Sequence, residues 1–148
     1  MDFLQIMTDV SRPEVAKKPW MEEVTMRLVT DEMLDEVVAE CMGVGHYGLD
    51  LETTGLDNRV FDGRTKDQIA GVCLSPNVTT GYYIPMRHKA GDCNLRVERV
   101  EDALRKLVNA EAVPVFHNAK FDQEFLAHCG GAPVGTWDSP SDFEDTYL

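Results

Sequence analysis

The sequence predicts an α/β protein of three layers, in which helices flank a central mixed sheet. Two observations carry this prediction. Strand-like segments follow one another at 46–53, 67–75 and 80–88, and the turn residues "PNVTT" between the last two indicate that the first strands are antiparallel. From residue 96 onward, helical and strand patterns alternate. The 148 residues correspond to one domain, which can bury a core without disulfides or a structural metal.

Further elements follow from periodicity. We expect a strand at 24–30 and then an amphipathic helix at 30–43, with acidic residues in its first turn and Gly43 just beyond its end. Its apolar face consists of Leu34, Val37, Val38 and Cys41. A second helix at 96–110 repeats Val100, Ala103, Leu104, Leu107 and Val108 on one face.

The last third of the chain continues the alternation. A short buried strand is expected at 112–118 and a helix closed by glycines at 119–131. The tail indicates a strand near Trp137 and the start of a helix at "EDTYL", residues 144–148. Residues 1–21 mix Pro, Lys and acidic residues and are interpreted as an N-terminal extension or arm, so the domain spans 22–148.

Charge and composition exclude several classes of function. With 14 basic and 26 acidic residues the net charge is −12, which argues against a free-standing, tight binder of phosphate backbones. The four cysteines are scattered, which favours buried thiols over a zinc site or a disulfide framework. No apolar run is long enough for a membrane span and no signal peptide is evident, so we expect a soluble, cytoplasmic protein.

The first motif lies in "HYGLDLETTGLDN", residues 46–58. In a strand, residues two apart point to the same side, so Asp50 and Glu52 project together while Leu49 and Leu51 pack into the core. Two adjacent carboxylates repel each other unless a cation lies between them, and hard ions such as Mg²⁺ or Mn²⁺ prefer oxygen ligands. The competing interpretation of this pattern alone is an exposed strand end.

The second motif lies in "VFHNAKFDQEFL", residues 115–126. Asp122 falls in the first turn of the expected helix, where the helix dipole favours a carboxylate. Phe116, Phe121 and Phe125 are interpreted as core residues, whereas Asn118 and Asp122 are hard to explain by packing. If this strand neighbours the first, a third carboxylate arrives beside Asp50 and Glu52.

The motifs "GLDLETTGLD" (48–57) and "HNAKFD" (117–122) together resemble the first two motifs of the DnaQ-like, or DEDD, 3′-5′ exonucleases. The closest likeness is to the proofreading domain of family A, polymerase I-type DNA polymerases of bacteria and phages. The segments "IAGVCLS", "GYYIPMRH" and "DFEDTYL" also resemble that family, so the likeness covers about residues 22–148. It implies an RNase H-like fold that is incomplete at its C-terminal end.

The resemblance also implies roles for individual residues. Asp50, Glu52 and Asp122 are the implied catalytic ligands of two divalent ions, Mg²⁺ or Mn²⁺, which hydrolyse the last phosphodiester at the 3′ end of single-stranded DNA. The implied substrate contacts are Thr53 at the 3′ end, Leu56 against the terminal base, Asn118 and Lys120 near the phosphate, and Phe121 in the aromatic position of the second motif. For Asp145 we expect a structural role.

The chain departs from the family pattern after Asp122, because no Y-x-x-x-D or H-x-x-x-D third motif follows. We therefore expect incomplete activity from this chain alone. The implied partners are the polymerase domain, a complementary exonuclease fragment or a second copy, bound through an exposed apolar face. Two alternatives stay open: a non-catalytic exonuclease-like module that binds or regulates, and an exoribonuclease of the RNase D type.

Overall fold

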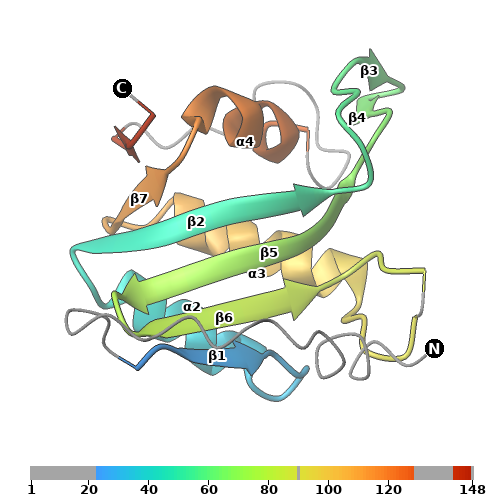
Figure 1. The fold of residues 1–148 in the computed structure, drawn as a ribbon. Coiled ribbons are helices and arrows are strands. Elements are labelled where there is room, and N and C mark those ends of the chain that lie inside the picture. The colour runs from blue at the N-terminus through green and yellow to red at the C-terminus, as the bar shows by residue number, and fades with distance from the viewer. Residues whose placement is uncertain (1–22, 90, 129–141, 148) are drawn as a thin grey trace, which may run out of the picture.

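The computed structural model describes residues 23–89, 91–128 and 142–147. In this part of the chain, a six-stranded sheet with the order β1-β6-β5-β2-β7-β8 is accompanied by a two-stranded hairpin, β3-β4 (Figure 1). The strands are β1 Thr25–Leu28, β2 His46–Thr53, β3 Val60–Phe61, β4 Arg64–Thr65, β5 Ile69–Asn77, β6 Thr80–Pro85, β7 Val113–Phe116 and β8 Glu144–Asp145. The helices are α2 Leu34–Met42, α3 Val97–Val108 and α4 Ala119–Leu126.

The sheet is mixed, as the sequence predicts. Strand β2 runs antiparallel to β5, and β5 runs antiparallel to β6. The outer strands are parallel to their neighbours: β1 to β6, β7 to β2 and β8 to β7. The α/β class and the antiparallel first strands are therefore confirmed, and β2 lies in the middle of the sheet with a partner on either side.

Helices α2 and α3 lie behind the sheet in Figure 1 and bury the faces that their periodicity predicts. The exposed fractions of Leu34, Val100 and Leu107 are 0%. Alternate residues of β2 and β5 point toward the same core, among them Leu49, Leu51 and Val72. The opposite face of the sheet carries the side chains that alternate with these, among them Asp50 and Glu52.

The expected helix start at 144–148 is wrong. Glu144 and Asp145 instead form β8, in parallel register with Val115 and Phe116 of β7. The backbone N–H of Thr146 donates to the carbonyl of Phe116 (3.0 Å) and extends this pairing. The segment thus satisfies backbone groups at an otherwise open sheet edge, which a helix at this position would leave unpaired.

The hairpin β3-β4 was not predicted. Its turn is Asp62-Gly63, and both residues have positive φ, 51° and 78°. An Asp-Gly pair suits such a turn because glycine has no Cβ and aspartate tolerates the left-handed region.

Some expectations fall on parts of the chain outside the described residues, namely the 1–21 arm, Cys129 and the strand near Trp137. Cys41, Cys73 and Cys93 are free thiols. Cys41 is buried as expected, whereas Cys73 and Cys93 are half-buried. No helix in the described ranges is long and apolar enough to cross a membrane.

Candidate active site

Strand β2 presents Asp50 and Glu52 on one face of the sheet. Both carboxylates are exposed, while the alternating Leu49 and Leu51 are 2% and 5% exposed on the core side. The strand leaves regular pairing immediately afterwards, because the register with β5 shifts between Glu52 and Thr53. Such irregularities often redirect side chains beside active sites. The paired projection expected of the D-x-E motif is confirmed.

Asp122 reaches the same strand from the side. Strand β7 pairs with β2 only as far as Gly48, opposite Val115, and the chain then turns into α4. The edge of β2 beyond Gly48 is therefore open to α4, and the Leu51 N–H donates to Asp122 Oδ1 across 3.0 Å. Since Leu51 lies between Asp50 and Glu52 in the chain, this hydrogen bond places the third carboxylate against the first motif.

The environment of Asp122 is electrostatically unfavourable for a carboxylate. Its side chain is 2% exposed. Burial, the largest cause, and the nearby charge of Asp50 together raise the pKa of Asp122 to about 6, against the Leu51 N–H, which acts in the opposite direction. A buried carboxylate next to another negative charge is stabilised by a cation, so this position suits a metal ligand.

The three carboxylates are neighbours but are not drawn together as a finished metal site. Within residues 23–89, 91–128 and 142–147, no three His, Cys, Asp or Glu side chains are close enough to hold an ion. The chemistry of the donors still fits a hard divalent cation, because all of them are carboxylate oxygens. Two of the three side chains, Asp50 and Glu52, are exposed and can therefore change conformation to reach an ion. Asp50, Glu52 and Asp122 are thus the residues that could hold such ions.

The loop after β2 is held by Asp67, a residue that the sequence analysis did not single out. Its carboxylate accepts hydrogen bonds from the Asp57 N–H (2.8 Å) and the Thr54 hydroxyl (3.3 Å). A Cβ at Gly55 would lie 2.4 Å from Asp67 Oδ2, so only glycine lets the carboxylate approach. Sequence periodicity does not identify Asp67 as a site residue, because Thr54 and Asp57 come close to it only through the irregular pairing of β2 with β5.

This loop displays Leu56 and constrains Thr53. Leu56, four residues after Glu52 in the chain, is 82% exposed. The Thr53 hydroxyl donates to the Gly55 carbonyl (2.6 Å), which leaves its oxygen as an acceptor. A single exposed leucine is common on protein surfaces, so the exposure of Leu56 is compatible with a ligand contact but does not by itself indicate one.

The residues predicted from the second motif have different environments. Asn118 has a left-handed backbone (φ 68°) and begins α4 without capping it through its own side chain. Asn118 and Lys120 are exposed. Phe121 is half-buried, packs against the core and lies 4.9 Å from Phe125 between ring centroids. Phe121 is therefore at least partly a packing residue.

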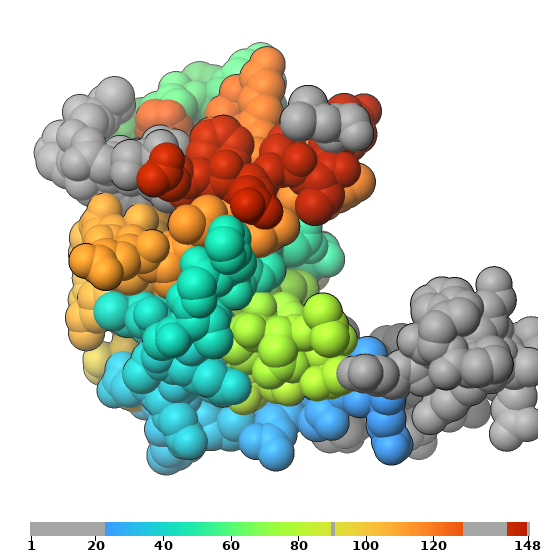
Figure 2. All heavy atoms as spheres, turned by 90° about the vertical axis from the view of Figure 1, so that its left-hand side faces the viewer, coloured from blue at the N-terminus to red at the C-terminus, as the bar shows by residue number. Residues whose placement is uncertain are grey.

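Asp145 has the structural position expected for it. Its carboxylate accepts the N–H groups of Asn118 (2.9 Å) and Ala119 (3.0 Å), and so caps α4 from a neighbouring strand. Figure 2 shows residues 142–147 (red) lying against the orange atoms of β7 and α4. Asp145 therefore fixes the start of the helix that carries Asp122.

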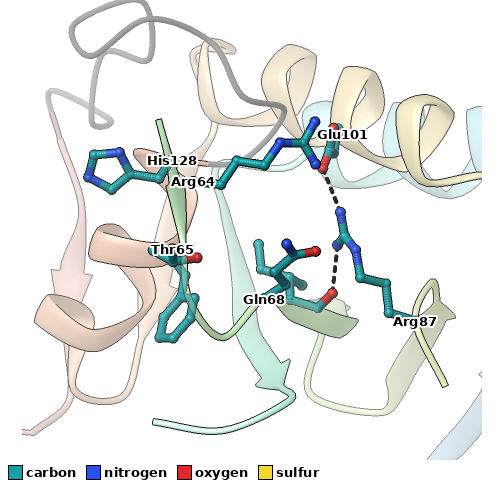
Figure 3. Close-up of a pocket in the computed structure, with 8 residues that line it drawn as sticks. Arg64, Thr65, Gln68, Arg87, Glu101 and His128 are labelled. Carbon is teal, nitrogen blue, oxygen red and sulfur yellow. Dashed lines mark hydrogen bonds and ion pairs between the residues drawn. The ribbon is translucent and has the colours of Figure 1, made fainter. Parts of the chain in front are cut away.

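A wide groove of about 740 Å³ begins beside Glu52. Its lining includes Glu52, Thr53, Tyr83 and His88. Arg87, which also lines the groove, forms a largely buried ion pair with Glu101 of α3 (2.9 Å) and donates to the Ile69 carbonyl (2.7 Å), as Figure 3 shows. Since Ile69 pairs with Thr53, this contact ties the end of β5 beside the first motif to the helical layer.

Comparisons with solved structures support the fold. NrnC of Brucella melitensis with bound Mg²⁺ superposes with a TM-score of 0.51 at 23% identity, over 84% of this chain and 50% of that one. The catalytic core of RRP6 from Trypanosoma brucei gives 0.56 at 18%, over 83% and 29%. RNase D of Escherichia coli gives 0.53 at 15%, over 84% and 27%. This chain thus spans half the length of the first structure and less than a third of the other two.

A search of curated proteins gives no match. A family model described as 3′-5′ exonuclease matches residues 26–142, which is most of the chain and includes both motifs. The match agrees with the mixed sheet and with the hydrogen bond by which α4 places Asp122 against β2. The chain belongs to this 3′-5′ exonuclease family, which is a family of hydrolases.

Proposed function

We propose that this chain is part of a proofreading-type exonuclease that removes nucleotides from the 3′ end of single-stranded DNA, as in a polymerase I-like DNA polymerase. One observation carries the proposal: the buried Asp122 is hydrogen bonded to the strand edge between Asp50 and Glu52. The name of the matching family model, which refers to A-type DNA polymerases, supports DNA as the substrate.

Asp50, Glu52 and Asp122 are the residues that would hold two divalent ions, Mg²⁺ or Mn²⁺. When bound, such a pair activates the attacking water and stabilises the leaving oxygen. The protein contributes position: the Leu51 N–H fixes one oxygen of Asp122, while the exposed Asp50 and Glu52 are free to adjust to the ligand.

Around these carboxylates the proposed substrate contacts are those of the two motifs. Leu56 packs against the terminal base, and the Thr53 oxygen accepts a hydrogen bond from the 3′ end. Lys120 and Asn118, both exposed at the start of α4, lie toward the phosphate. Phe121, in the aromatic position of the second motif, is half-buried on α4 and would contact the bound strand with its exposed part.

A complete site requires more than these residues. Residues 123–148 contain no Y-x-x-x-D or H-x-x-x-D sequence. We therefore propose that the fourth carboxylate lies outside residues 1–148, in a further segment of an exonuclease of which these residues are a piece, in a complementary exonuclease fragment or in a second copy. The non-catalytic alternative is a module that binds a strand without cutting it.

RNA is the second candidate substrate. The fold is shared with an Escherichia coli RNase D that is described as an exoribonuclease involved in structured RNA processing. It is also shared with NrnC, of which a structure with bound pGG exists. The test of the proposed function must therefore include both nucleic acids.

The test is the degradation of 5′-labelled single strands of DNA and RNA of the same sequence by the purified chain with Mn²⁺ or Mg²⁺. Asp50→Asn and Asp122→Asn are compared with Asp102→Asn, an exposed acidic residue that pairs with Arg105 on α3. Because the site lacks its fourth carboxylate, we expect little or no cleavage by the chain alone. Products that shorten from the 3′ end of DNA, absent in the two site variants and kept in the control, would show that the site is completed within the chain or its oligomer.

Other outcomes separate the alternatives. Faster shortening of RNA than of DNA would support the exoribonuclease. Binding of the strand that depends on metal and on Asp50, without any cleavage, would support the binding module or a site completed by a partner. Cleavage that persists in both Asn variants would contradict the proposal.

A further inference from the structure

Tyr83 shares the face of the sheet that carries the candidate active site. Asp50 is opposite Cys73 on β5, and Cys73 is opposite Tyr83 on β6. Residues opposite each other in antiparallel strands point to the same side, so Asp50, Cys73 and Tyr83 form one row across the open face. The next row begins with Glu52, which is opposite Gly71.

The ring of Tyr83 leans from its own row toward Glu52. A Cβ at Gly71 would lie 2.1 Å from the Tyr83 hydroxyl oxygen, so the hydroxyl occupies the place of the missing side chain. Cross-strand neighbours have Cβ atoms about 4.5–5.5 Å apart. The Tyr83 hydroxyl therefore lies beside the Glu52 side chain, and both line the 740 Å³ groove.

His88 holds this hydroxyl in place. Its Nε2 is 2.6 Å from the Tyr83 hydroxyl oxygen. The backbone of His88 is fixed in turn by Asn94, which accepts the His88 N–H (2.9 Å) and donates to the His88 carbonyl (2.8 Å). Such a chain of contacts fixes the orientation of a polar group before a ligand binds, and so reduces the side-chain entropy that is lost on binding.

The neighbouring tyrosine shows the contrast. Tyr82 points to the core side of the sheet, is 6% exposed, and donates its hydroxyl hydrogen bond to Glu40 of α2 (2.6 Å). Its contact joins the sheet to the helical layer. Tyr83 instead directs its hydroxyl along the open face, toward the groove beside the first motif.

We propose that Tyr83 is a substrate-binding residue of this site, whose hydroxyl donates a hydrogen bond to a sugar-phosphate oxygen of the bound strand, with His88 as its positioning residue. The inference rests on the proposed function and adds a subsite to it. When His88 donates from Nε2 to the tyrosine oxygen, the phenolic proton points into the groove. The Tyr83 hydroxyl is uncharged, so it can donate to a phosphate oxygen without adding to the negative charge of the neighbouring carboxylates and without needing a counter-ion of its own.

The test measures binding rather than cleavage. The probe is a 5′-fluorescein-labelled single-stranded tetradeoxythymidylate, titrated with the chain in the presence of Ca²⁺ and followed by fluorescence anisotropy. Loss of one neutral hydrogen bond corresponds to a roughly three- to tenfold rise in Kd, which we expect for Tyr83→Phe. The matched control Tyr82→Phe loses a hydrogen bond of the same kind on the other face, and its Kd should not change.

Three further variants separate binding from folding. His88→Ala should raise Kd as Tyr83→Phe does, and His88→Gln, which keeps a hydrogen-bonding group, should recover part of the affinity. Gly71→Ala should raise Kd with both tyrosines intact, because the new methyl group displaces the Tyr83 hydroxyl. The Tm of each variant is recorded, since a merely structural role would lower Tm without these differences in Kd.

The outcomes are distinguishable. Equal Kd values for wild type and Tyr83→Phe would overturn this inference and leave the proposed function standing. Equal losses in Tyr82→Phe and Tyr83→Phe would also overturn it, because the effect would then be one of stability. A wild-type chain that binds no strand would overturn both proposals.

Discussion

At Asp122, the carboxylate that the candidate metal site needs in its charged form lowers the stability of the fold, because it is buried. Its folded-state pKa of about 6 lies above the ordinary value near 3.8. Between these values the folded state binds the proton and the unfolded state releases it. Stability is therefore unaffected below about pH 4, falls as pH rises to about 6, and stays lower above it. The full difference is about 3 kcal/mol.

Asp122→Asn should remove this effect. The amide oxygen can still accept the Leu51 N–H, but it carries no charge. Without divalent ions, we expect the variant to be more stable than wild type at pH 7, by up to about 3 kcal/mol, and similar at pH 4. Urea unfolding at both pH values measures this. Asp102→Asn serves as the exposed control, and an Asn variant that is less stable than wild type at pH 7 would contradict the burial argument.

Single residues show where sequence is sufficient and where it is not. The projection of Asp50 and Glu52 follows from strand alternation alone, and the position of Asp122 follows once its strand neighbours β2. Asp67 could not be found in this way. Its contacts with Thr54 and Asp57 depend on a register shift that local sequence does not reveal.

At the scale of elements, β8 acts as a cap for α4. The pKa of Asp145 is lowered by N–H groups of Tyr147, Ala119 and Asn118 that donate to its carboxylate. We expect Asp145→Ala to lower Tm and to weaken metal binding at Asp122, since two N–H groups at the start of α4 lose their acceptor. Because the folded-state pKa is depressed, the contribution of Asp145 is present at neutral pH and is lost as pH falls through that pKa.

The measurement for Asp145 is thermal unfolding at neutral and acidic pH. Asp142→Ala, an exposed acidic residue of the same segment, is the matched control. Asp145→Asn, which keeps an acceptor oxygen, should lie between wild type and Asp145→Ala. A Tm for Asp145→Ala equal to that of the control would show that α4 is not capped by β8.

The two errors at this scale have separate physical causes. Glu144 and Asp145 carry no strand periodicity, and they form β8 because β7 offers unpaired backbone groups at its edge. A local pattern cannot show this tertiary effect. The Asp62-Gly63 turn was a local signal, and the two-residue strands on either side of it were too short to be recognised by alternation.

At the scale of the whole molecule, a chain of net charge −12 places three carboxylates around one strand edge. Divalent ions should therefore stabilise the fold by binding the folded state. A ligand at 100 times its Kd contributes about 2.7 kcal/mol. We expect Mn²⁺ to raise the Tm of wild type, with a larger effect above pH 6, where Asp122 gives up its proton without a metal.

The specific ion effect must be separated from general screening of charge. NaCl at equal ionic strength screens the −12 charge without binding the site, so the rise in Tm beyond that in NaCl is the quantity to compare. Asp50→Asn should lose most of this difference, and Asp102→Asn should keep it. If Mn²⁺ raises the Tm of wild type, Asp50→Asn and Asp102→Asn by the same amount, the ions act on the overall charge rather than at the three carboxylates of the candidate site. The buried charge of Asp122 would then destabilise the fold without a bound ion to offset it.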